Sequence, residues 1–233
     1  MKIAVLMPTY NEIEVLETTV QNLFQSQPDV DLIILDDNSP DGTGQLADQL
    51  ANENDQIHVI HRSHKSGLGK AYAQGFRYSL EHGYDRIVQM DADGSHRSKD
   101  LSQLLADNAD LVIGSRWVSG GEVLNWPKHR LWISKAGNAY ARFAIGSTIK
   151  DVTAGYRNYS AELLSKLPIE EIEAKGYGFQ VEMTKLALER GGVVREVPIT
   201  FVERESGRSK MTIDIIFEAF SLCTKWLFER IRR

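Results

Sequence analysis

The chain has 233 residues, of which 42% are hydrophobic and 25% charged, a balance typical of a globular protein that can bury a core. Its formal net charge of −5 disfavours a general nucleic-acid binder, so no nucleic-acid partner is expected. No stretch reaches the roughly 18–20 apolar residues of a membrane span, and the polar residues of MPTYNE interrupt the first apolar run before it could form a secretion signal.

Short apolar runs alternate with segments of helical periodicity along the first half of the chain. Parallel strands need long crossover connections and are buried on both faces, so this alternation predicts an α/β fold: a Rossmann-like, mostly parallel sheet with helices on both faces. The predicted strands are 3–7, 32–35, 57–60, 86–90 and 111–113, and the predicted helices are 12–25, 42–51, 69–82 and 99–107.

The second half of the chain has a looser pattern. Residues 117–132 contain glycines, a proline and three basic residues, and we interpret them as a functional loop. Helices are predicted over 134–145 and 178–189, and a strand over 193–202. No repeat or linker interrupts the chain, so we expect a single domain that spans residues 1–233.

The last segment, residues 211–233, is predicted to form an amphipathic helix. Its polar residues fall on one narrow stripe and leave a broad apolar face that includes Ile213, Phe220 and Leu227. This face has two open interpretations: it packs on the protein itself, or it lies on a membrane or on the helices of a partner. Residues 190–233 carry nine Lys and Arg against six Asp and Glu, so this end is basic within an acidic chain.

Polar or charged residues directly follow four of the predicted strands. In an open α/β sheet, ligands bind beyond the carboxyl ends of the strands, so these clusters are expected to meet at one edge and form a binding site. The clusters are Pro8–Glu12, Asp36–Asp41, Asp91–Asp93 and Gly114–Arg116.

Asp91 and Asp93 are the pair with the clearest chemistry. They follow a buried run, so their carboxylates are held close together and repel each other. A hard divalent cation such as Mg²⁺ or Mn²⁺ resolves this repulsion, and phosphate oxygens commonly fill its remaining positions. A D-x-D elsewhere is more often a turn or a helix cap, but at the end of a buried strand it predicts a metal-assisted diphosphate site.

Two other nucleotide-binding motifs are absent from the sequence. The glycine-rich segment Lys65–Lys70 lacks the spacing of a phosphate loop, and Ala71 stands in place of the hydroxyl that would bind a metal. The first strand is not followed by G-x-G-x-x-G. A phosphate-loop NTPase and a dinucleotide oxidoreductase are therefore disfavoured.

A resemblance to a known family is carried by eight motifs, in order from Ile3 to about Lys210. Together they resemble glycosyltransferase family 2 and, within it, the mannose synthases that act on dolichyl or polyprenyl phosphates. The resemblance implies a GT-A fold with a nucleotide-sugar-binding half over about 1–115, an acceptor half and basic loop over about 116–210, and the amphipathic helix after it. The motifs are MPTYNE, LDDNSPDGT, GLGKA, DADGSH, IGSR, DVTAGYRNY, GYGFQVE and RESGRSK.

The resemblance also implies which residues bind the donor. Asp91 and Asp93 are expected to hold Mg²⁺ or Mn²⁺, with Ser95 at a position where some relatives have a glutamine ligand. Nucleotide-sugar contacts are expected from Pro8, Tyr10, Glu12, Leu35, Asp37, Asp91, Ala92, Asp93, Arg116, Arg204 and Lys210.

For the acceptor, the resemblance implies that Arg116, Arg130 and Ser134 receive its phosphate. Catalysis would be carried by Asp93, Arg116 and Lys210. Further positions match the family without a definite role. They are Asp151, Arg157, Gln180 and Glu182.

The implied reaction is inverting transfer of mannose from GDP-mannose to a polyprenyl phosphate, which gives a β-mannosyl phosphopolyprenol. A phosphate oxygen is already ionised near neutral pH, so the reaction needs electrostatic stabilisation rather than a general base. Two alternatives stay open: glucosyl transfer from UDP-glucose to the same lipid class, and a non-catalytic nucleotide-sugar-binding regulator.

The implied location is the cytoplasmic face of a membrane. Cys223 is the one cysteine, so no internal disulfide can form, which is typical of a reducing compartment. Some relatives carry transmembrane helices after the catalytic domain, and none is predicted here. We therefore expect peripheral contact, either with a membrane surface or with a membrane-embedded partner.

Overall fold

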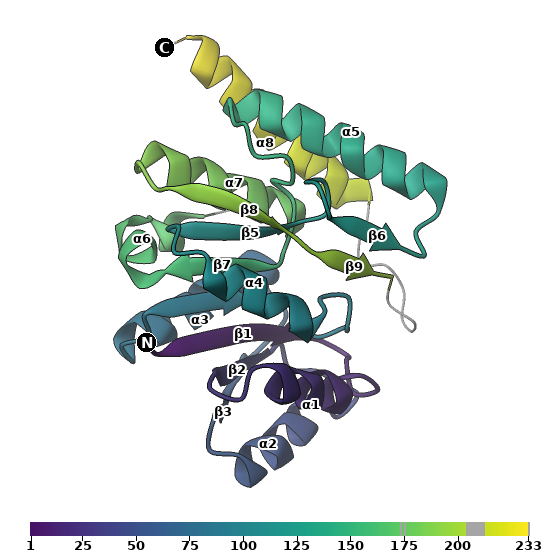
Figure 1. Cartoon of the computed structure of the whole chain (residues 1–233), viewed down its shortest axis with the longest axis vertical. Helices are drawn as coiled ribbons and strands as arrows, with labels where there is room; N and C mark the ends of the chain where they lie inside the picture. The colour runs from purple at the N-terminus through teal and green to yellow at the C-terminus, as the bar shows by residue number, and fades with distance from the viewer. Residues whose placement is uncertain (173, 175, 204–212, 233) are drawn as a thin grey trace.

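A seven-stranded sheet forms the centre of the computed structural model (Figure 1), which describes residues 1–172, 174, 176–203 and 213–232. The strand order is β3-β2-β1-β4-β7-β5-β8. β7 runs antiparallel to both of its neighbours and the other pairings are parallel, which confirms the predicted sheet. The strands are β1 (Ile3–Thr9), β2 (Asp31–Asp36), β3 (Ile57–His61), β4 (Arg86–Gln89), β5 (Leu111–Ser115), β7 (Arg157–Ser160) and β8 (Val194–Pro198), and a separate parallel pair is β6 (Glu122–Leu124) with β9 (Thr200–Val202).

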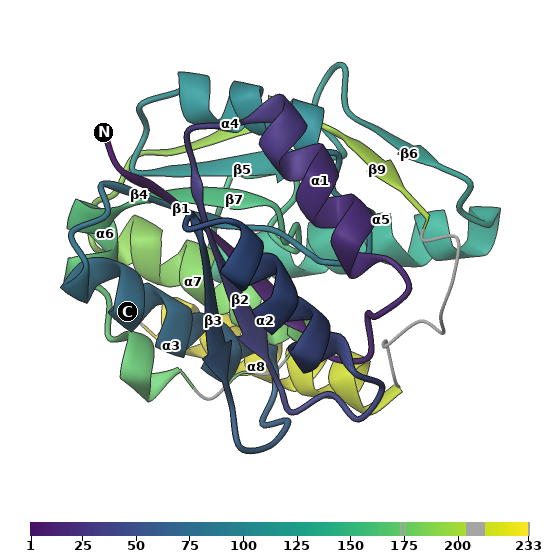
Figure 2. The same cartoon turned by 90° about the horizontal axis from the view of Figure 1, so that it is seen from below.

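Helices cover both faces of this sheet (Figure 2), as predicted. Successive strand residues point to opposite faces, so Leu6 and Ile33 enter one core while Val5 and Ile34 enter the other. On one face lie α1 (Leu16–Ser26), α2 (Thr43–Glu53) and α4 (Leu101–Ala106), and on the other α3 (Leu68–Glu81), α6 (Ala161–Lys166) and α7 (Gly176–Glu189), with 3₁₀ turns η1 (Ser98–Asp100) and η2 (Ile169–Glu171).

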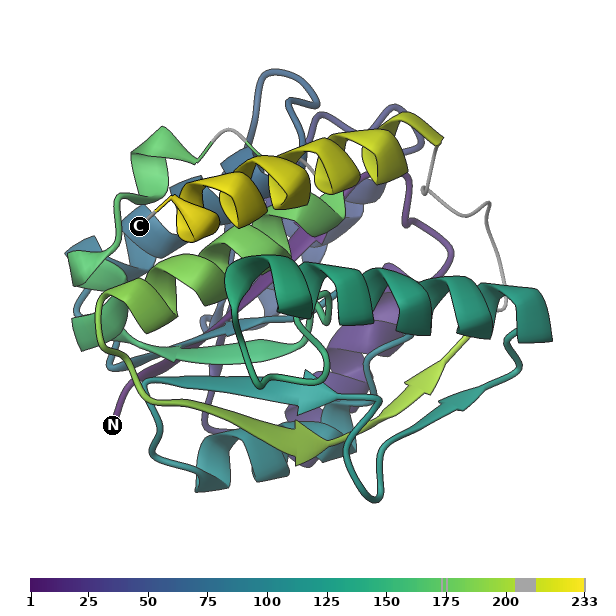
Figure 3. The same ribbon diagram turned by 90° about the horizontal axis from the view of Figure 1, so that it is seen from above.

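A further layer consists of α5 (Lys128–Ile145) and α8 (Ile213–Ile231), which lie side by side at one end of the molecule (Figures 1 and 3). Cys223 and Trp226 of α8 are buried where α8 packs against α5 and α7. Phe220 stacks on Tyr140 of α5 with ring centres 4.7 Å apart. Part of the apolar face of α8 therefore packs on the protein itself, whereas Phe228 remains exposed.

Three elements show the largest departures from their predicted boundaries. The helix predicted from residue 12 begins at Leu16, because Asn11 takes a left-handed φ of 58° and the chain turns first. The helix predicted from residue 134 begins at Lys128, directly after Pro127, whose fixed φ suits the start of a helix. The strand predicted over 193–202 is two strands, because β8 pairs with β5 and β9 pairs with β6.

The strand β7 was not predicted, because it lacks an apolar run. Its residues Arg157 and Asn158 are completely buried, although both are polar. Asn158 accepts a hydrogen bond from Arg86 Nε at 3.0 Å and donates one to the Leu104 carbonyl at 2.8 Å. Side-chain hydrogen bonds thus replace the hydrophobic pattern by which a buried strand is recognised.

The strand order reverses beside β1, and in open α/β sheets the ligand crevice lies at such a point. β2 and β4 are the neighbours of β1, and the loops that follow these strands diverge from it. Asn11 and Asn38 take left-handed φ angles of 58° and 57° in the loops after β1 and β2. The Asn11 N–H donates to Ser39 Oγ at 3.2 Å, which joins the two loops.

The buried Arg157 gives a test of this core. Its guanidinium donates to the carbonyls of Val152 and Ala154, both at 2.7 Å. We expect Arg157→Met to lower the free energy of unfolding by about 2–5 kcal/mol, because both carbonyls lose their partner in the interior. Urea unfolding measures this change. The matched control is Arg195→Met, whose exposed ion pair with Asp107 predicts a loss below about 1 kcal/mol, and equal losses in the two variants would contradict the assignment.

Candidate active site

The loops that follow β2 and β3 bring charged side chains close to one another. Asp37 is buried and forms an ion pair with Arg62. Burial raises the pKa of the Asp37 carboxyl, and the Arg62 guanidinium opposes this shift. The ammonium of Lys65 lies 4.0 Å from the centre of the Tyr10 ring. Tyr10 and Asp37, both predicted to contact the nucleotide, therefore each lie beside a cation, and neither cation was among the predicted site residues.

The ends of β1 and β2 lie side by side where the strand order reverses. Pro8 and Glu12 are half-buried there, and the Glu12 N–H donates to Thr43 Oγ1 at 3.0 Å. Leu35 was predicted to contact the nucleotide sugar. It is 0% exposed and packs in the core against α3, where Gly75 leaves room for it. In this structure Leu35 supports the site from beneath, and its contact with the donor stays a prediction.

Asp91 and Asp93 lie in a tight turn at the end of β4. Gly94 has a φ of 75°, which a glycine adopts without strain. Asp93 Oδ1 accepts hydrogen bonds from the Ser95 N–H at 3.1 Å and from Ser95 Oγ at 2.6 Å. The Ala92 carbonyl accepts one from Thr19 at 3.0 Å. Ser95 is buried and orients the Asp93 carboxylate, while its role as a metal ligand stays a prediction.

The buried Tyr72 hydroxyl is under the electrostatic influence of both carboxylates. The pKa of Tyr72 is raised well above its ordinary value, first by burial and then by the charges of Asp91, Tyr159 and Asp93. Both aspartates therefore act on the same hydroxyl. This hydroxyl has no hydrogen-bond partner within the part of the chain that the structure describes.

His96 connects the turn that contains Asp91 and Asp93 to the strand β9. The Asp91 N–H donates to His96 Nδ1 at 3.0 Å, so Nε2 carries the ring proton and lies 3.8 Å from Asp91 Oδ2. The buried ring stacks on Tyr156, with ring centres 4.7 Å apart, and meets Phe201 edge-on. A backbone bridge joins His96 to Phe201 as well. The acidic turn and β9 are thus one packed unit.

These residues fit a hard divalent cation that is bound together with a diphosphate. Among residues 1–172, 174, 176–203 and 213–232, no three His, Cys, Asp or Glu side chains gather into a group that could hold a metal ion. The protein offers two neighbouring carboxylates instead. Mg²⁺ is usually held by one or two carboxylates, with substrate phosphates completing its shell, and the donor set matches this pattern.

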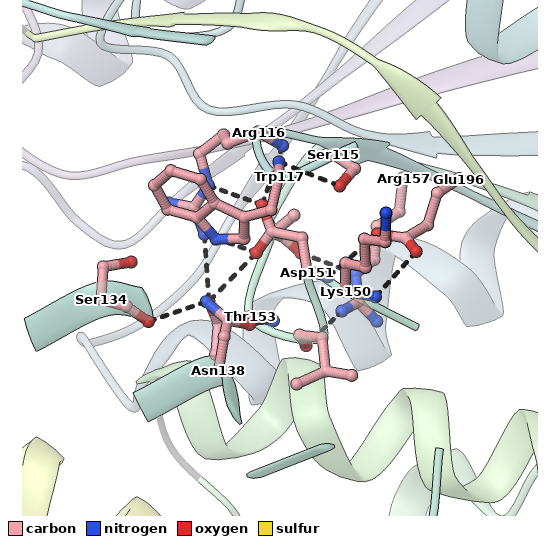
Figure 4. Close-up of polar contacts among 12 residues, drawn as sticks. Ser115, Arg116, Trp117, Ser134, Asn138, Lys150, Asp151, Thr153, Arg157 and Glu196 are labelled. Atoms are coloured by element: carbon pink, nitrogen blue, oxygen red, sulfur yellow. Dashed lines mark hydrogen bonds and ion pairs between the residues drawn. The ribbon is translucent and has the colours of Figure 1, made fainter. Parts of the chain in front are cut away.

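Arg116, at the end of β5, is held by a buried carboxylate (Figure 4). Its Nε and Nη2 each donate to Asp151 at 2.7 Å, and Nη2 also donates to Thr153 Oγ1 at 3.0 Å. Asp151 is completely buried, and its own N–H donates to Glu196 at 2.9 Å. The bidentate pair fixes the plane of the guanidinium. Because the charge is balanced within the protein, Arg116 can lie in the interior beside the crevice.

Arg130 and Ser134 lie one turn apart on α5 and therefore on the same side of the helix. Arg130 forms an ion pair with Glu203, and its guanidinium lies 4.2 Å from the centre of the Trp126 ring. The Arg130 Nε is buried without a hydrogen-bond partner among the described residues. Asn138, one turn further along, donates to the Ser134 carbonyl at 3.1 Å.

A cavity of about 150 Å³ brings these side chains together between α5, α7 and α8. Arg116, Arg130 and Ser134, the three residues predicted to receive the acceptor phosphate, all line it. The rest of its lining is mostly apolar and includes Val181 and Phe220. Two arginine side chains and a group of apolar side chains thus line the same cavity.

Two predicted site residues are not described by the structure, and two residues of the site were not predicted. Arg204 and Lys210 lie outside the described residues. Arg62 and Glu203 were missed, because each becomes part of the site only through an ion pair with a residue distant in the sequence. A charge at the end of a predicted strand was the available signal, and Arg62 directly follows β3.

Comparison with known proteins identifies the family. The family model described as "Glycosyl transferase family 2" matches residues 4–167. The chain belongs to glycosyltransferase family 2. The undecaprenyl-phosphate mannosyltransferase of Micrococcus luteus is 51% identical to this family 2 glycosyltransferase over 228 residues, which cover 97% of this chain and 94% of that protein. The polyprenol monophosphomannose synthase of Mycolicibacterium smegmatis is 50% identical over 226 residues, with 95% and 85% covered.

Solved structures show the same fold. Glucosyl-3-phosphoglycerate synthase from Mycobacterium tuberculosis, in complex with Mn²⁺, UDP-glucose and phosphoglyceric acid, has a TM-score of 0.70 at 19% identity, with 97% of this chain and 80% of that chain covered. Its UDP complex has a TM-score of 0.69 at 18% identity over the same shares. This likeness confirms the GT-A fold of this family 2 glycosyltransferase.

The buried pair of Arg116 and Asp151 gives a test of the site. We expect Asp151→Asn to lower the free energy of unfolding by about 3–5 kcal/mol, because the Arg116 charge stays buried without its counter-ion. Chemical denaturation measures the loss. The control is Glu170→Gln, which breaks an exposed carboxylate–arginine pair with Arg77 and should cost less than about 1 kcal/mol. An Asp151→Asn protein as stable as this control would show that the pair does not hold the site.

Proposed function

We propose that this glycosyltransferase transfers mannose from GDP-mannose to a polyprenyl phosphate, with inversion at the anomeric carbon. The observation that carries this proposal is the cavity, which Arg116 and Arg130 line beside the same Trp126 ring and whose other lining is mostly apolar. Such a space suits a phosphate attached to an apolar chain. The two curated relatives, at 51% and 50% identity, are named for mannose transfer of this type, which supports the proposal.

In this proposal, the half over residues 1–115 binds the donor. Pro8, Tyr10, Glu12 and Asp37 surround the nucleoside. Asp91, Ala92 and Asp93 lie against the ribose and diphosphate. When bound, Mg²⁺ or Mn²⁺ supplies positive charge against the diphosphate of the leaving nucleotide. Arg204 and Lys210, both outside the described residues, keep their predicted role at the same diphosphate.

The acceptor phosphate then attacks without a general base. One of its oxygens forms a bond to the anomeric carbon while the bond from that carbon to the GDP oxygen breaks, and GDP leaves with the electron pair. The attacking oxygen is already ionised, so Asp93 need not remove a proton. Arg116 and Arg130 hold the phosphate against its repulsion from the donor, and Ser134 adds a hydroxyl donor.

A transfer assay tests this function. We expect label from GDP-mannose to pass into an organic-extractable lipid when polyprenyl phosphate and Mn²⁺ are present. Asp93→Ala should lower this rate by at least about 100-fold, because one of the two carboxylates of the acidic turn is lost. Glu170→Gln, on a distant exposed ion pair, should keep the rate of the wild type.

The same assay separates the alternatives. Label that passes from UDP-glucose and not from GDP-mannose would contradict the proposed donor and favour glucosyl transfer. Binding of either nucleotide sugar without transfer to lipid would favour a non-catalytic regulator.

We also propose that the protein acts as a peripheral protein on the cytoplasmic face of a membrane, through the outer surface of α5 and α8. Trp132 and Phe143 of α5 and Phe228 and Ile231 of α8 are each more than half exposed. In the part of the chain that the structure describes, no helix has the length and apolar character needed to span a bilayer. Exposed aromatic side chains on neighbouring helices suit insertion into a lipid surface or contact with a membrane-embedded partner.

Flotation with anionic lipid vesicles tests this surface. We expect the double variant Trp132→Ser, Phe143→Ser to bind at least about tenfold more weakly than the wild type, because burying each such side chain contributes about 1.5–3 kcal/mol. The control is Leu188→Ser, Val193→Ser, which removes two exposed apolar residues elsewhere. Equal flotation of both variants would contradict the proposed surface, and wild-type flotation that requires native membranes would favour a protein partner.

A further inference from the structure

We infer that the cavity between α5 and α8 holds the isoprene unit next to the acceptor phosphate, and that Gly137 keeps this space open. This inference rests on the proposed function and assigns Gly137 as a specificity-determining residue. It concerns how the protein recognises the hydrocarbon of its acceptor, whereas the arginines recognise the phosphate.

The size of the cavity matches one isoprene unit. The cavity has a volume of about 150 Å³, and an engineered apolar cavity of about that volume stays dry and binds benzene, a six-carbon ring. An isoprene unit has five carbons. Arg116 and Arg130 at one end place the phosphate, so the first unit of the lipid would lie among Tyr140, Val181 and Cys223.

The cavity also has an exit for the rest of the lipid. Ile133 of α5 and Phe220 of α8 line it, and both are 55% exposed, so the cavity reaches the protein surface between the two helices. The exposed residues Phe143 and Phe228 belong to the same pair of helices. A lipid anchored at the arginines can therefore leave the cavity along an apolar surface.

Gly137 is not explained by the backbone or by packing. It lies in the middle of α5 without a positive φ, where glycine is less favourable than alanine. Apart from its chain neighbours and the backbone of its own helix, a Cβ added at Gly137 would meet no atom of the described residues within 4 Å. At Gly178 of α7, by contrast, a Cβ would lie 3.3 Å from Leu222, so close packing accounts for that glycine. Gly137 is exposed and lines the cavity, so its missing side chain leaves open space on that side of α5.

Three variants test this inference. Gly137→Leu fills the cavity with a side chain that suits a helix, and Gly137→Ala fills it in part while favouring the helix. Ala136→Leu adds the same leucine at an exposed position of α5 that does not line the cavity. Thermal unfolding should show all three folded, because the described residues leave open space around a Cβ at position 137 and position 136 is exposed.

Acceptors of increasing chain length show which isoprene unit the cavity binds. Initial rates with methyl phosphate, dimethylallyl phosphate and farnesyl phosphate give kcat/KM for none, one and three isoprene units. We expect the wild type and Ala136→Leu to gain about tenfold or more from none to one unit, because that unit becomes buried. Gly137→Leu should lose this gain, with Gly137→Ala between them. Titration with GDP-mannose should give equal affinities for all the proteins.

The outcomes separate this inference from the function on which it rests. If the wild type transfers mannose to farnesyl phosphate and Gly137→Leu gains as much from the first unit as the wild type, the proposed function stands and the cavity inference is overturned. If Ala136→Leu loses the gain to the same extent, the effect does not come from the cavity, and the inference is overturned too. A wild type that transfers mannose to no acceptor overturns the proposed function and this inference together.

Discussion

The buried ion pair between Arg116 and Asp151 is the interaction on which the rest of the site depends. A guanidinium can lie in the interior because a completely buried carboxylate balances its charge and takes up two of its donors. Asp151 is itself fixed by Glu196 of β8, so the pair ties the end of β5 to the loop before β7. The position of Arg116 is therefore set before any ligand arrives, which is the condition for electrostatic catalysis.

A second chain of contacts joins the acidic turn to the acceptor side. His96 holds the Asp91 backbone and packs against Phe201 of β9, whose ring centre lies 5.5 Å from the Arg116 guanidinium. Two residues further along, Glu203 forms an ion pair with Arg130 of α5. The carboxylates proposed to lie near the metal and the arginines proposed to lie near the acceptor are thus placed by one short strand, so a shift of β9 would disturb both.

The sequence was sufficient for the parts of the fold that follow local rules. Apolar runs predicted the parallel strands, and the acidic pair Asp91 and Asp93 was found because it directly follows such a run. The strand β7 escaped prediction, because Arg157 and Asn158 are buried through hydrogen bonds and leave no apolar pattern. The partners of the site arginines escaped for a different reason: the Glu203–Arg130 pair joins residues 73 positions apart, and no local pattern records such a contact.

The arrangement of the layers explains how one protein can serve a water-soluble donor and a lipid acceptor. The polar strand ends gather at the edge of the sheet where β1 reverses the strand order, while α5 and α8 form an outer layer with exposed aromatic side chains. Arg116, at the end of β5, and Phe220 of α8 line the same cavity, so one strand end of the sheet and the outer layer share this space. A ligand with a charged head and a hydrocarbon body suits both kinds of lining, and on the proposed function we expect phosphates without a chain and lipids without a phosphate to bind less well.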